Sequence, residues 1–419
     1  MAFIKIPVKG MCDILPDDLR LRQKLLNAIR SAYSRYGFEE IETPVMEHIE
    51  NLTNKQGGDN EKLIFKVMKR GAELERARQK GGELADMGMR YDLTVPLARY
   101  YANNSAKLLS PFKAMQIANV WRADNPQKGR FRQFMQCDID ILGDSTNYAE
   151  IELISATANM LMDIFKDINI PSVTVHINDR RILIAAALKA GFRNEDIPSV
   201  LISLDKLDKI GYDGVQKELE DKGFDILTVE SYLSIYRNCS DNITCRAFCD
   251  TVGGVGQEVV SNLSEIIECC EISASGKLNF IFDPTLVRGM GYYTGPIFEI
   301  FAEGYSFSLA GGGRYDEMIE KFSGMKTSAV GFSIGFERIV TILKDYSDGQ
   351  LKLTDNGVAF LVDKGVSAEK KMQIFKEAQQ LRAGGRVVTV QIMKKNMKFQ
   401  IDELEKNGYV EFRKIYAND

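Results

Sequence analysis

The sequence lacks the features that mark membrane, secreted and disulfide-rich proteins. No run approaches the roughly 18 consecutive uncharged apolar residues that a membrane-spanning helix needs. The N-terminal MAFIKIPVKG has no apolar run long enough for a signal peptide. The seven cysteines include no CxxC pair, so neither a zinc ribbon nor a redox motif is predicted. We therefore expect a cytoplasmic protein with reduced thiols and no membrane association.

Nucleotide-binding and metal-binding motifs are also missing. There is no GxxxxGK[ST] phosphate loop and no GxGxxG fingerprint. If the protein uses ATP, side chains on an antiparallel sheet must hold it. Cys239, Cys245 and Cys249 are clustered but lack the usual zinc spacing. Buried or free thiols are favoured there, and no metal site is predicted.

The composition is that of an ordinary globular protein. The 419 residues are 45% hydrophobic and 27% charged, which allows two or three domains with a large core. A net charge of −4 argues against a DNA-coating protein. The segment from Leu351 to Asp419 nevertheless carries 13 Lys and Arg against 9 Asp and Glu, and such a local excess suits contact with RNA.

Strand and helix patterns divide the chain into a core with an inserted helical segment. Strand patterns alternate with helices up to Asn178, give way to helices with charged faces from Asp179 to Gly276, and then return. After a polar linker, the chain alternates strand, helix, strand, helix and strand, which predicts a small α/β domain. The expected domains are a core (1–178 and 277–345), a helical insertion (179–276) and a C-terminal domain (356–419).

Two strand patterns, AMQIANVWRAD and FRQFMQCDIDILG, predict an antiparallel hairpin. Arg122 and Asp124 share one face of the first strand, because residues of the same parity lie on the same side. Gln136 and Asp140, about 13 Å apart, share a face of the second strand with Arg132. The opposite face is apolar. For such a hairpin alone, a solvated outer face is favoured over a polar pocket, although the polar groups are sparse for an open surface.

Three further segments carry candidate binding groups. In MGMRYDLTVP, read as a strand, Asp92 and Thr94 share a face that suits an ammonium group. In VRGMGYYTG, Arg288 precedes Tyr292 and Tyr293, although an aromatic core strand explains the pair equally well. In VGFSIGFERI, Arg338 projects from the first turn of a helix, where phosphate binds readily. A surface arginine is the more common explanation of that last feature.

Taken in order, these segments resemble one family. KGMCDILP, RYDLTVPLARY and LVRGMGYYTG are similar to segments of histidyl-tRNA synthetases, and GFEEIETPV, VWRADNPQKGRFRQFMQCDIDILG and VGFSIGFERI are similar to motifs 1, 2 and 3 of class II aminoacyl-tRNA synthetases. The resemblance covers residues 8 to 344. It implies an α+β fold with a six-stranded antiparallel sheet flanked by helices, and a homodimer.

The resemblance also implies a role for each candidate residue. Asp92, Thr94 and Gln136 would hold the α-amino group of histidine, and Asp140 and Tyr292 would bond its ring nitrogens, with Tyr293 beside them. Arg122 and Arg288 would act as catalytic residues at the α-phosphate. The remaining ATP contacts would come from Arg130 and Arg338 at the outer phosphates and from Asp124 near the adenine.

The implied activity is ATP-dependent activation of histidine and its transfer to the 3′ end of tRNA(His), with magnesium bound to the phosphates. Gly291 stands where many relatives have aspartate, and Asp124 stands where many have glutamate. The C-terminal segment resembles an anticodon-binding domain that ends after its third strand. The alternative is a catalytically silent paralogue that regulates ATP phosphoribosyltransferase, but Arg122, Arg288 and Arg338 favour the enzyme. A class II synthetase for threonine or proline would not need the two tyrosines.

Overall fold

The computed structural model describes residues 3–53, 60–126, 131–168, 170, 172–240, 242–274, 278–288, 292–346 and 355–417. The chain forms two compact units. The first unit comprises residues 1–12 and 27–341, and the second comprises residues 13–26 and 342–419. Within the described residues, no helix is long and apolar enough to cross a membrane.

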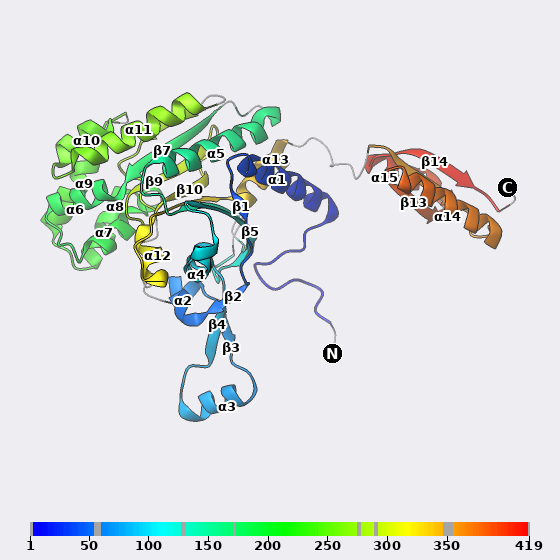
Figure 1. Ribbon diagram of the computed structural model, residues 1–419, viewed down its shortest axis with the longest axis horizontal. Helices are drawn as coiled ribbons and strands as arrows, with labels where there is room; N and C mark the ends of the chain where they lie inside the picture. Colours follow the sequence, from blue (N-terminus) through cyan, green and yellow to red (C-terminus); the bar gives the residue numbers. More distant parts are fainter. Residues whose placement is uncertain are drawn as a thin grey trace. The chain divides into compact units, whose positions relative to one another are not determined.

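An eight-stranded sheet forms the centre of the first unit (Figure 1). Its order is β1 (Glu39–Glu40), β5 (Phe112–Trp121), β6 (Gln133–Leu142), β11 (Ala329–Ile334), β10 (Ser308–Arg314), β9 (Pro296–Ala302), β7 (Val173–Asp179) and β8 (Leu278–Phe282). The six inner strands, from β5 to β7, pair antiparallel with one another. The expected number of six strands is therefore wrong, because β1 and β8 add a parallel strand at each edge.

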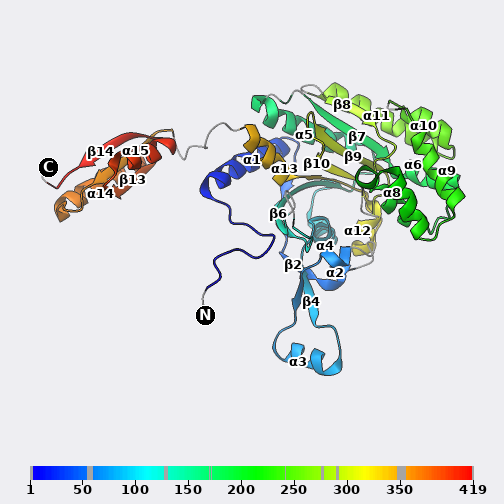
Figure 2. The same ribbon diagram turned by 180° about the vertical axis from the view of Figure 1, so that it is seen from behind.

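Helices cover the two faces of this sheet. The long helix α5 (Tyr148–Phe165) contacts β6, β10 and β11, and it packs against α11 (Gln257–Ser273). The shorter helices α4 (Thr94–Asn104) and α12 (Asp316–Ser323) pack against each other. Figure 2 shows α5 and α11 on one side of the sheet and α4 and α12 towards the other. Helices α1 (Pro16–Ser34) and α13 (Phe336–Tyr346) follow the helical patterns of the sequence.

The segment expected as a strand in MGMRYDLTVP divides into a strand and a helix. Strand β4 (Ala85–Met89) ends early, and α4 begins at Thr94. Asp92 Oδ1 accepts a hydrogen bond of 3.2 Å from the backbone N–H of Val95, which satisfies a donor at the start of the helix. Asp92 and Thr94 therefore do not share a strand face. Strand β4 instead pairs with β2 (Met46–His48) and β3 (Lys66–Met68), and it contacts α2 (Ile49–Thr53). The chain between β2 and β4 also contains η1 (Asn60–Leu63) and α3 (Gly71–Lys80).

Helices fill the chain between β7 and β8. Side chains at three of their starts accept a backbone N–H bond: Asp179, Asp225 and Thr244. The helical character expected from Asp179 to Gly276 is present, whereas the limits of a separate domain stay a prediction. The helices are α6 (Arg180–Ala190), α7 (Ile197–Leu204), α8 (Leu207–Asp221), α9 (Ile226–Arg237), α10 (Cys245–Val252) and α11.

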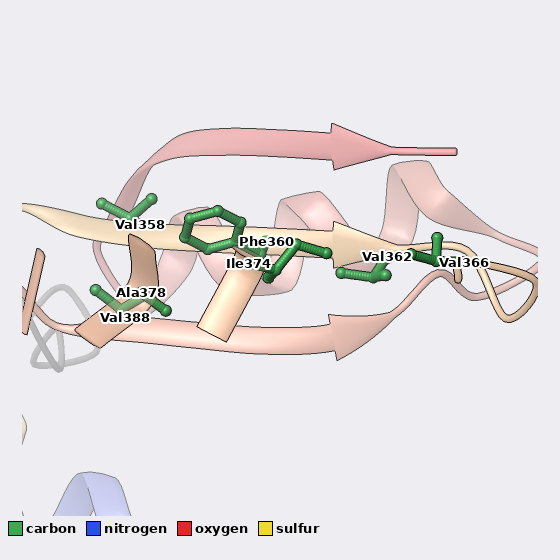
Figure 3. Packing of buried hydrophobic residues seen from close by; sticks show 7 residues of the cluster. All are labelled: Val358, Phe360, Val362, Val366, Ile374, Ala378 and Val388. Carbon is green, nitrogen blue, oxygen red and sulfur yellow. The ribbon is translucent and has the colours of Figure 1, made fainter. Parts of the chain in front are cut away.

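The second unit contains the predicted alternation of strands and helices. Its elements are β12 (Gly357–Val362), α14 (Ala368–Ala383), β13 (Val388–Ile392), α15 (Met397–Lys406) and β14 (Tyr409–Ile415). The strands form a parallel sheet in the order β13, β12, β14. On one face of β12, Val358, Phe360 and Val362 pack against residues of α14 and β13 (Figure 3). On the other face, Ala359 and Leu361 pack with Leu404 and Tyr409.

Candidate active site

A cavity of about 180 Å³ lies on the polar face of β6, β10 and β11. Its lining comes from these strands, from the turn between β4 and α4, and from the segments that follow β5 and precede β9. Eight residues predicted from the sequence line it together: Asp92, Thr94, Arg122, Gln136, Asp140, Arg288, Tyr292 and Tyr293. The polar face of the hairpin is therefore a lined pocket, and the solvated face favoured by the pattern alone is wrong.

Two glycines of the sheet leave space for side chains of the cavity to pack directly against the backbone. A Cβ atom on Gly311 of β10 would stand 2.5 Å from Arg288 Nη1. A Cβ atom on Gly331 of β11 would stand 2.1 Å from Asp140 Oδ1. Because real side chains do not approach so closely, any other residue at these positions displaces Arg288 or Asp140. The two glycines thus allow a cation and an acid to lie directly over the sheet.

Asp140 and three tyrosines form one end of the pocket. The hydroxyl of Tyr315 donates a hydrogen bond of 2.5 Å to Asp140 Oδ1. The ring centroid of Tyr292 lies 4.6 Å from that of Tyr293 and 6.0 Å from that of Tyr315. Burial, and then the charge of Asp138, raises the pKa of Asp140 well above its usual range. This end of the pocket therefore offers a buried acid and aromatic hydroxyls to a flat polar ring.

Asp92, Gln136 and Asp138 form a second polar group, and each is at most 7% exposed. Gln136 Nε2 donates a hydrogen bond of 2.7 Å to Asp138 Oδ2. Burial raises the pKa of Asp92 to about 6 and that of Asp138 to about 7. Three of their oxygens, Asp92 Oδ2, Gln136 Oε1 and Asp138 Oδ1, are buried without a hydrogen-bond partner among the described residues. Buried acceptors of this kind are normally satisfied, so they indicate a ligand that donates hydrogen bonds.

Two arginines supply the positive charge of the pocket. Arg122 follows β5, which ends at Trp121, so Arg122 and Asp124 lie beyond the strand in which they were expected. Arg122 Nε donates a hydrogen bond of 2.9 Å to the carbonyl of Tyr91, and its guanidinium lies 5.1 Å from the ring centroid of Phe134. Arg288 forms an ion pair with Glu299 of β9. The Glu299 carboxylate therefore holds Arg288 at the cavity wall above Gly311.

Two of the other predicted ATP-binding residues, Arg338 and Asp124, do not line this cavity. Arg338 is exposed at the start of α13, where it donates a hydrogen bond of 2.5 Å to the carbonyl of Ser308. Asp124 is described but does not line the pocket, and its carbonyl accepts a bond of 2.9 Å from Arg132 Nε. Arg130 and Gly291 lie outside the described residues. The structure thus joins eight of the eleven predicted site residues, and it leaves the roles of all of them as proposals.

Sequence reasoning missed Asp138, Glu299 and Tyr315. Asp138 has the same parity as Gln136 and Asp140 on β6, so strand alternation alone would have found it. The run Gly311-Gly312-Gly313 inside a strand was a signal of close approach. It marks the place over which Arg288 lies, and Tyr315 follows soon after it. Glu299 sits within a strand whose other residues are apolar or proline, PIFEIFA, which is an unusual place for an unpaired acid.

The clustered cysteines do not come together as a set. Cys245 Sγ and Cys249 Sγ lie 3.9 Å apart on α10. Cys239 Sγ instead donates to the carbonyl of Ile235. In the part of the chain that the structure describes, no group of three or more His, Cys, Asp or Glu is arranged to hold a metal ion.

Comparison with known proteins identifies relatives of this chain. A family model for histidyl-tRNA synthetase matches residues 10–339. The histidine–tRNA ligase of Leifsonia xyli subsp. xyli is 40% identical over 433 residues, covering 100% of this chain and 97% of the relative. That of Bacteroides fragilis is 37% identical over 350 residues, covering 80% of this chain and 75% of the relative.

Solved structures give the same result. The crystal structure of histidyl-tRNA synthetase from Nostoc sp. PCC 7120 superimposes with a TM-score of 0.74 at 27% identity, covering 97% of this chain and 90% of the other. A Bacillus halodurans structure, described as an ATP phosphoribosyltransferase regulatory subunit/histidyl-tRNA synthetase, has a TM-score of 0.74 at 20% identity, with 99% of each chain covered, which speaks for the fold alone. The family model and the relatives together show that the chain belongs to the histidyl-tRNA synthetase family.

Proposed function

We propose that this protein is a histidine–tRNA ligase, which activates histidine with ATP and transfers it to the 3′ end of tRNA(His). The observation that carries the proposal is one small cavity that holds two arginines at its wall and buried acids, an amide and tyrosines around it. Relatives named histidine–tRNA ligase reach 33% to 40% identity. The regulatory-subunit alternative is not favoured, since the relatives that match most of the chain at 33% to 40% identity are named histidine–tRNA ligase.

The proposed chemistry needs positive charge more than a base. The histidine carboxylate attacks the α-phosphate of ATP in line, pyrophosphate leaves, and no proton has to move. Negative charge grows on the phosphate oxygens in the transition state. Arg122 and Arg288, already fixed by Tyr91 and Glu299, are oriented before the reaction begins. Preorganised cations of this kind each contribute roughly 3 kcal/mol to lowering the barrier.

Selectivity for histidine rests on the end of the cavity that holds Asp140. Asp140 and Tyr292 are proposed to bond the two ring nitrogens, with Tyr293 beside them. Tyr315 already donates to Asp140 Oδ1, so it fixes the direction of that carboxyl group. A substrate without matching ring nitrogens leaves these buried groups unpaired, and sites of this kind discriminate by about 10⁴ to 10⁵.

Magnesium enters this proposal only as a companion of the ATP phosphates. No described group of three or more acidic, histidine or cysteine side chains offers it a dedicated site. The ion commonly binds substrate phosphates and keeps several waters. When bound there, it would share the phosphate charge with the arginines.

Contact with tRNA is proposed for the second unit. Lys364, Lys394 and Lys395 line a cavity of about 800 Å³ beside the carboxyl ends of β12 and β13. Lysines that neutralise phosphates supply much of the affinity for RNA. Lys398 lies nearby in the sequence, on α15. A homodimer, and a cytoplasmic location that fits a role in translation, are further parts of the proposal that follow from the family.

The test is amino-acid-dependent exchange of pyrophosphate into ATP with a panel of amino acids, followed by transfer to tRNA(His). We expect exchange with histidine and none above background with threonine, proline or glutamine. Histidine exchange without transfer would limit the proposal to the activation step. Absence of exchange with every amino acid would overturn it and favour a regulatory subunit.

A further inference from the structure

Asp138 is a buried acid of the cavity to which the proposed mechanism gives no role. It lies on β6 between Gln136 and Asp140 and is 4% exposed. The register of the sheet places Gln116 of β5 on one side of it and Ser333 of β11 on the other. A side chain enclosed in this way cannot turn to solvent to satisfy its charge. The oxygen that Gln136 does not bond, Asp138 Oδ1, must therefore find a partner within the cavity.

The bond between Gln136 and Asp138 determines which atoms face the cavity. When Asp138 is ionised, its carboxylate only accepts hydrogen bonds, so the Gln136 side chain then presents its NH₂ group to Asp138 Oδ2. This leaves Gln136 Oε1 as an acceptor, whatever the assignment of the amide atoms. Asp138 Oδ1 is likewise left without a hydrogen-bond partner among the described residues, although Ser333 lies close enough to lower the pKa of Asp138 against the effect of burial.

Asp92 supplies the third oxygen of the same kind. Its Oδ1 accepts from Val95 at the start of α4, and its Oδ2 has no partner among the described residues. The residues that line the cavity therefore include three, Asp92, Gln136 and Asp138, with a buried acceptor oxygen that no other described residue satisfies. An ammonium group has three N–H donors and one positive charge. It matches this set in number, in polarity and in charge.

We propose that Asp138 binds the α-ammonium group of the amino-acid substrate directly, as a third acceptor beside Asp92 and Gln136. This inference rests on the proposed function, because it assumes an amino-acid substrate in this cavity. A positive ligand also relieves the repulsion between Asp92 and Asp138, whose raised pKa values reflect burial without a full complement of partners. Asp138 thus contributes to binding the amino group and not only to holding Gln136.

Asp138→Asn separates these two roles. The asparagine carbonyl can still accept the bond from Gln136 Nε2, so the orientation of Gln136 is kept. Its NH₂ group then replaces Oδ1, and an acceptor becomes a donor that opposes an ammonium. Two ligands report on the difference. Histidinol carries the ammonium without the carboxylate, and imidazole-4-propionate carries the ring and the carboxylate without the ammonium.

The experiment measures the binding of both ligands to the full chain by calorimetry, with Asp163→Asn as the matched control. Asp163 lies on α5, and its side chain is 62% exposed. We expect Asp138→Asn to weaken histidinol by roughly tenfold to a hundredfold, and to change imidazole-4-propionate by less than about twofold. The control should match the wild type with both ligands.

Equal losses for both ligands, or unchanged binding of histidinol, would overturn the role of Asp138. Histidine-dependent exchange by the wild-type protein tests the proposed function separately, so the two failures are distinguishable. If Asp138→Asn does not fold, Asp138→Ser removes the same acceptor with less volume. The same selective loss of histidinol is expected from it.

Discussion

Strands β6 and β12 are both central and buried, yet they bury opposite kinds of side chain. Along β12, each residue from Gly357 to Val362 is buried, and none has a polar side chain. Along β6, the residues from Gln136 to Leu142 are buried too, but one face carries the polar Gln136, Asp138 and Asp140. The other face of β6 resembles β12, with Cys137, Ile139 and Ile141 at most 1% exposed.

The difference shows what each strand is built to do. Apolar burial on β12 stabilises the second unit through the hydrophobic effect, and its two faces pack against α14 and α15. Polar burial on β6 costs stability unless every group is paired, and two of its oxygens find no partner in the described part of the chain. Such a cost is retained where a ligand supplies the missing partners. Burial alone therefore does not identify a core. Among the described residues, three of the five buried side-chain atoms without a hydrogen-bond partner belong to residues that line the pocket.

The largest effect is expected from breaking the apolar strand. Phe360 is fully buried in β12, so Phe360→Ala should destabilise the second unit by roughly 3–5 kcal/mol. Histidine-dependent exchange should persist, because every residue that lines the pocket belongs to the first unit. Hydrogen exchange of peptides from β12 to β14, measured alongside enzymatic exchange, checks both statements.

Phe375→Ala is the matched control, since Phe375 lies on α14 and is 55% exposed. It should leave the hydrogen exchange of the three strands nearly unchanged. Loss of enzymatic exchange in Phe360→Ala, with the first unit still folded, would show that the two units do not act separately.

The next largest effect is expected from removing a charge at the polar pocket. Arg288→Ala should lower the kcat of histidine-dependent exchange by about 10²-fold or more, because it deletes a preorganised cation beside the α-phosphate. The substitution also leaves Glu299 without its cation, so the folded fraction is measured together with kcat. Arg35→Ala, at an arginine whose side chain is 66% exposed, serves as the control. Near-normal kcat in Arg288→Ala would refute the catalytic role.

The contrast between β6 and β12 also explains what the sequence could predict. Strand β12 follows from its continuous apolar run GVAFLV, and α14 follows from its helical periodicity and its Ser367 cap. The β5–β6 hairpin follows from its two strand patterns and the turn between them. Local patterns therefore predict these elements, because each is determined by the spacing of its own apolar residues and by the residues at its ends.

The rest depended on contacts between residues far apart in the chain. Tyr315 reaches Asp140 across 175 positions, and no local pattern reveals such a pairing. Asp92 was placed on a strand because RYDLTVP alternates, whereas the hydrogen bond to Val95 starts a helix there. The pocket residues were brought together by the resemblance to a family, since pattern reasoning alone favoured a solvated face.

A smaller effect is expected at the acid that holds the pocket arginine. Glu299→Gln keeps the shape of β9 but removes the charge that pairs with Arg288. We expect kcat for exchange to fall by about tenfold, with KM for histidine nearly unchanged, because Glu299 acts through Arg288. Glu303→Gln, just after the same strand, is the matched control, since Glu303 accepts instead from Ser172. A change in KM alone would indicate that Glu299 contacts the substrate itself.

The smallest effect concerns the stability of the free protein as a function of pH. The folded-state pKa of Asp138, about 7, lies above its ordinary value. Its contribution to stability is therefore present at low pH and lost as the pH rises through 7. Asp138→Asn removes this loss. Its free energy of unfolding, relative to that of the wild type, should therefore increase by roughly 1 kcal/mol between pH 5.5 and pH 8.5. Asp92, whose pKa is raised to about 6, titrates in both proteins, so its contribution largely cancels when the two free energies are compared.

Thermal melting at pH 5.5, 7.0 and 8.5 measures this difference. Asp163→Asn, the same change at an exposed site, should follow the wild type at each pH. Added histidinol should then stabilise the wild type more than Asp138→Asn at pH 8.5, because an ammonium ligand satisfies the acid that the substitution removes. Parallel melting curves for Asp138→Asn and wild type would mean that the polar face of β6 carries no free-energy cost at Asp138. The contrast with β12 would then rest on Gln136 and Asp140.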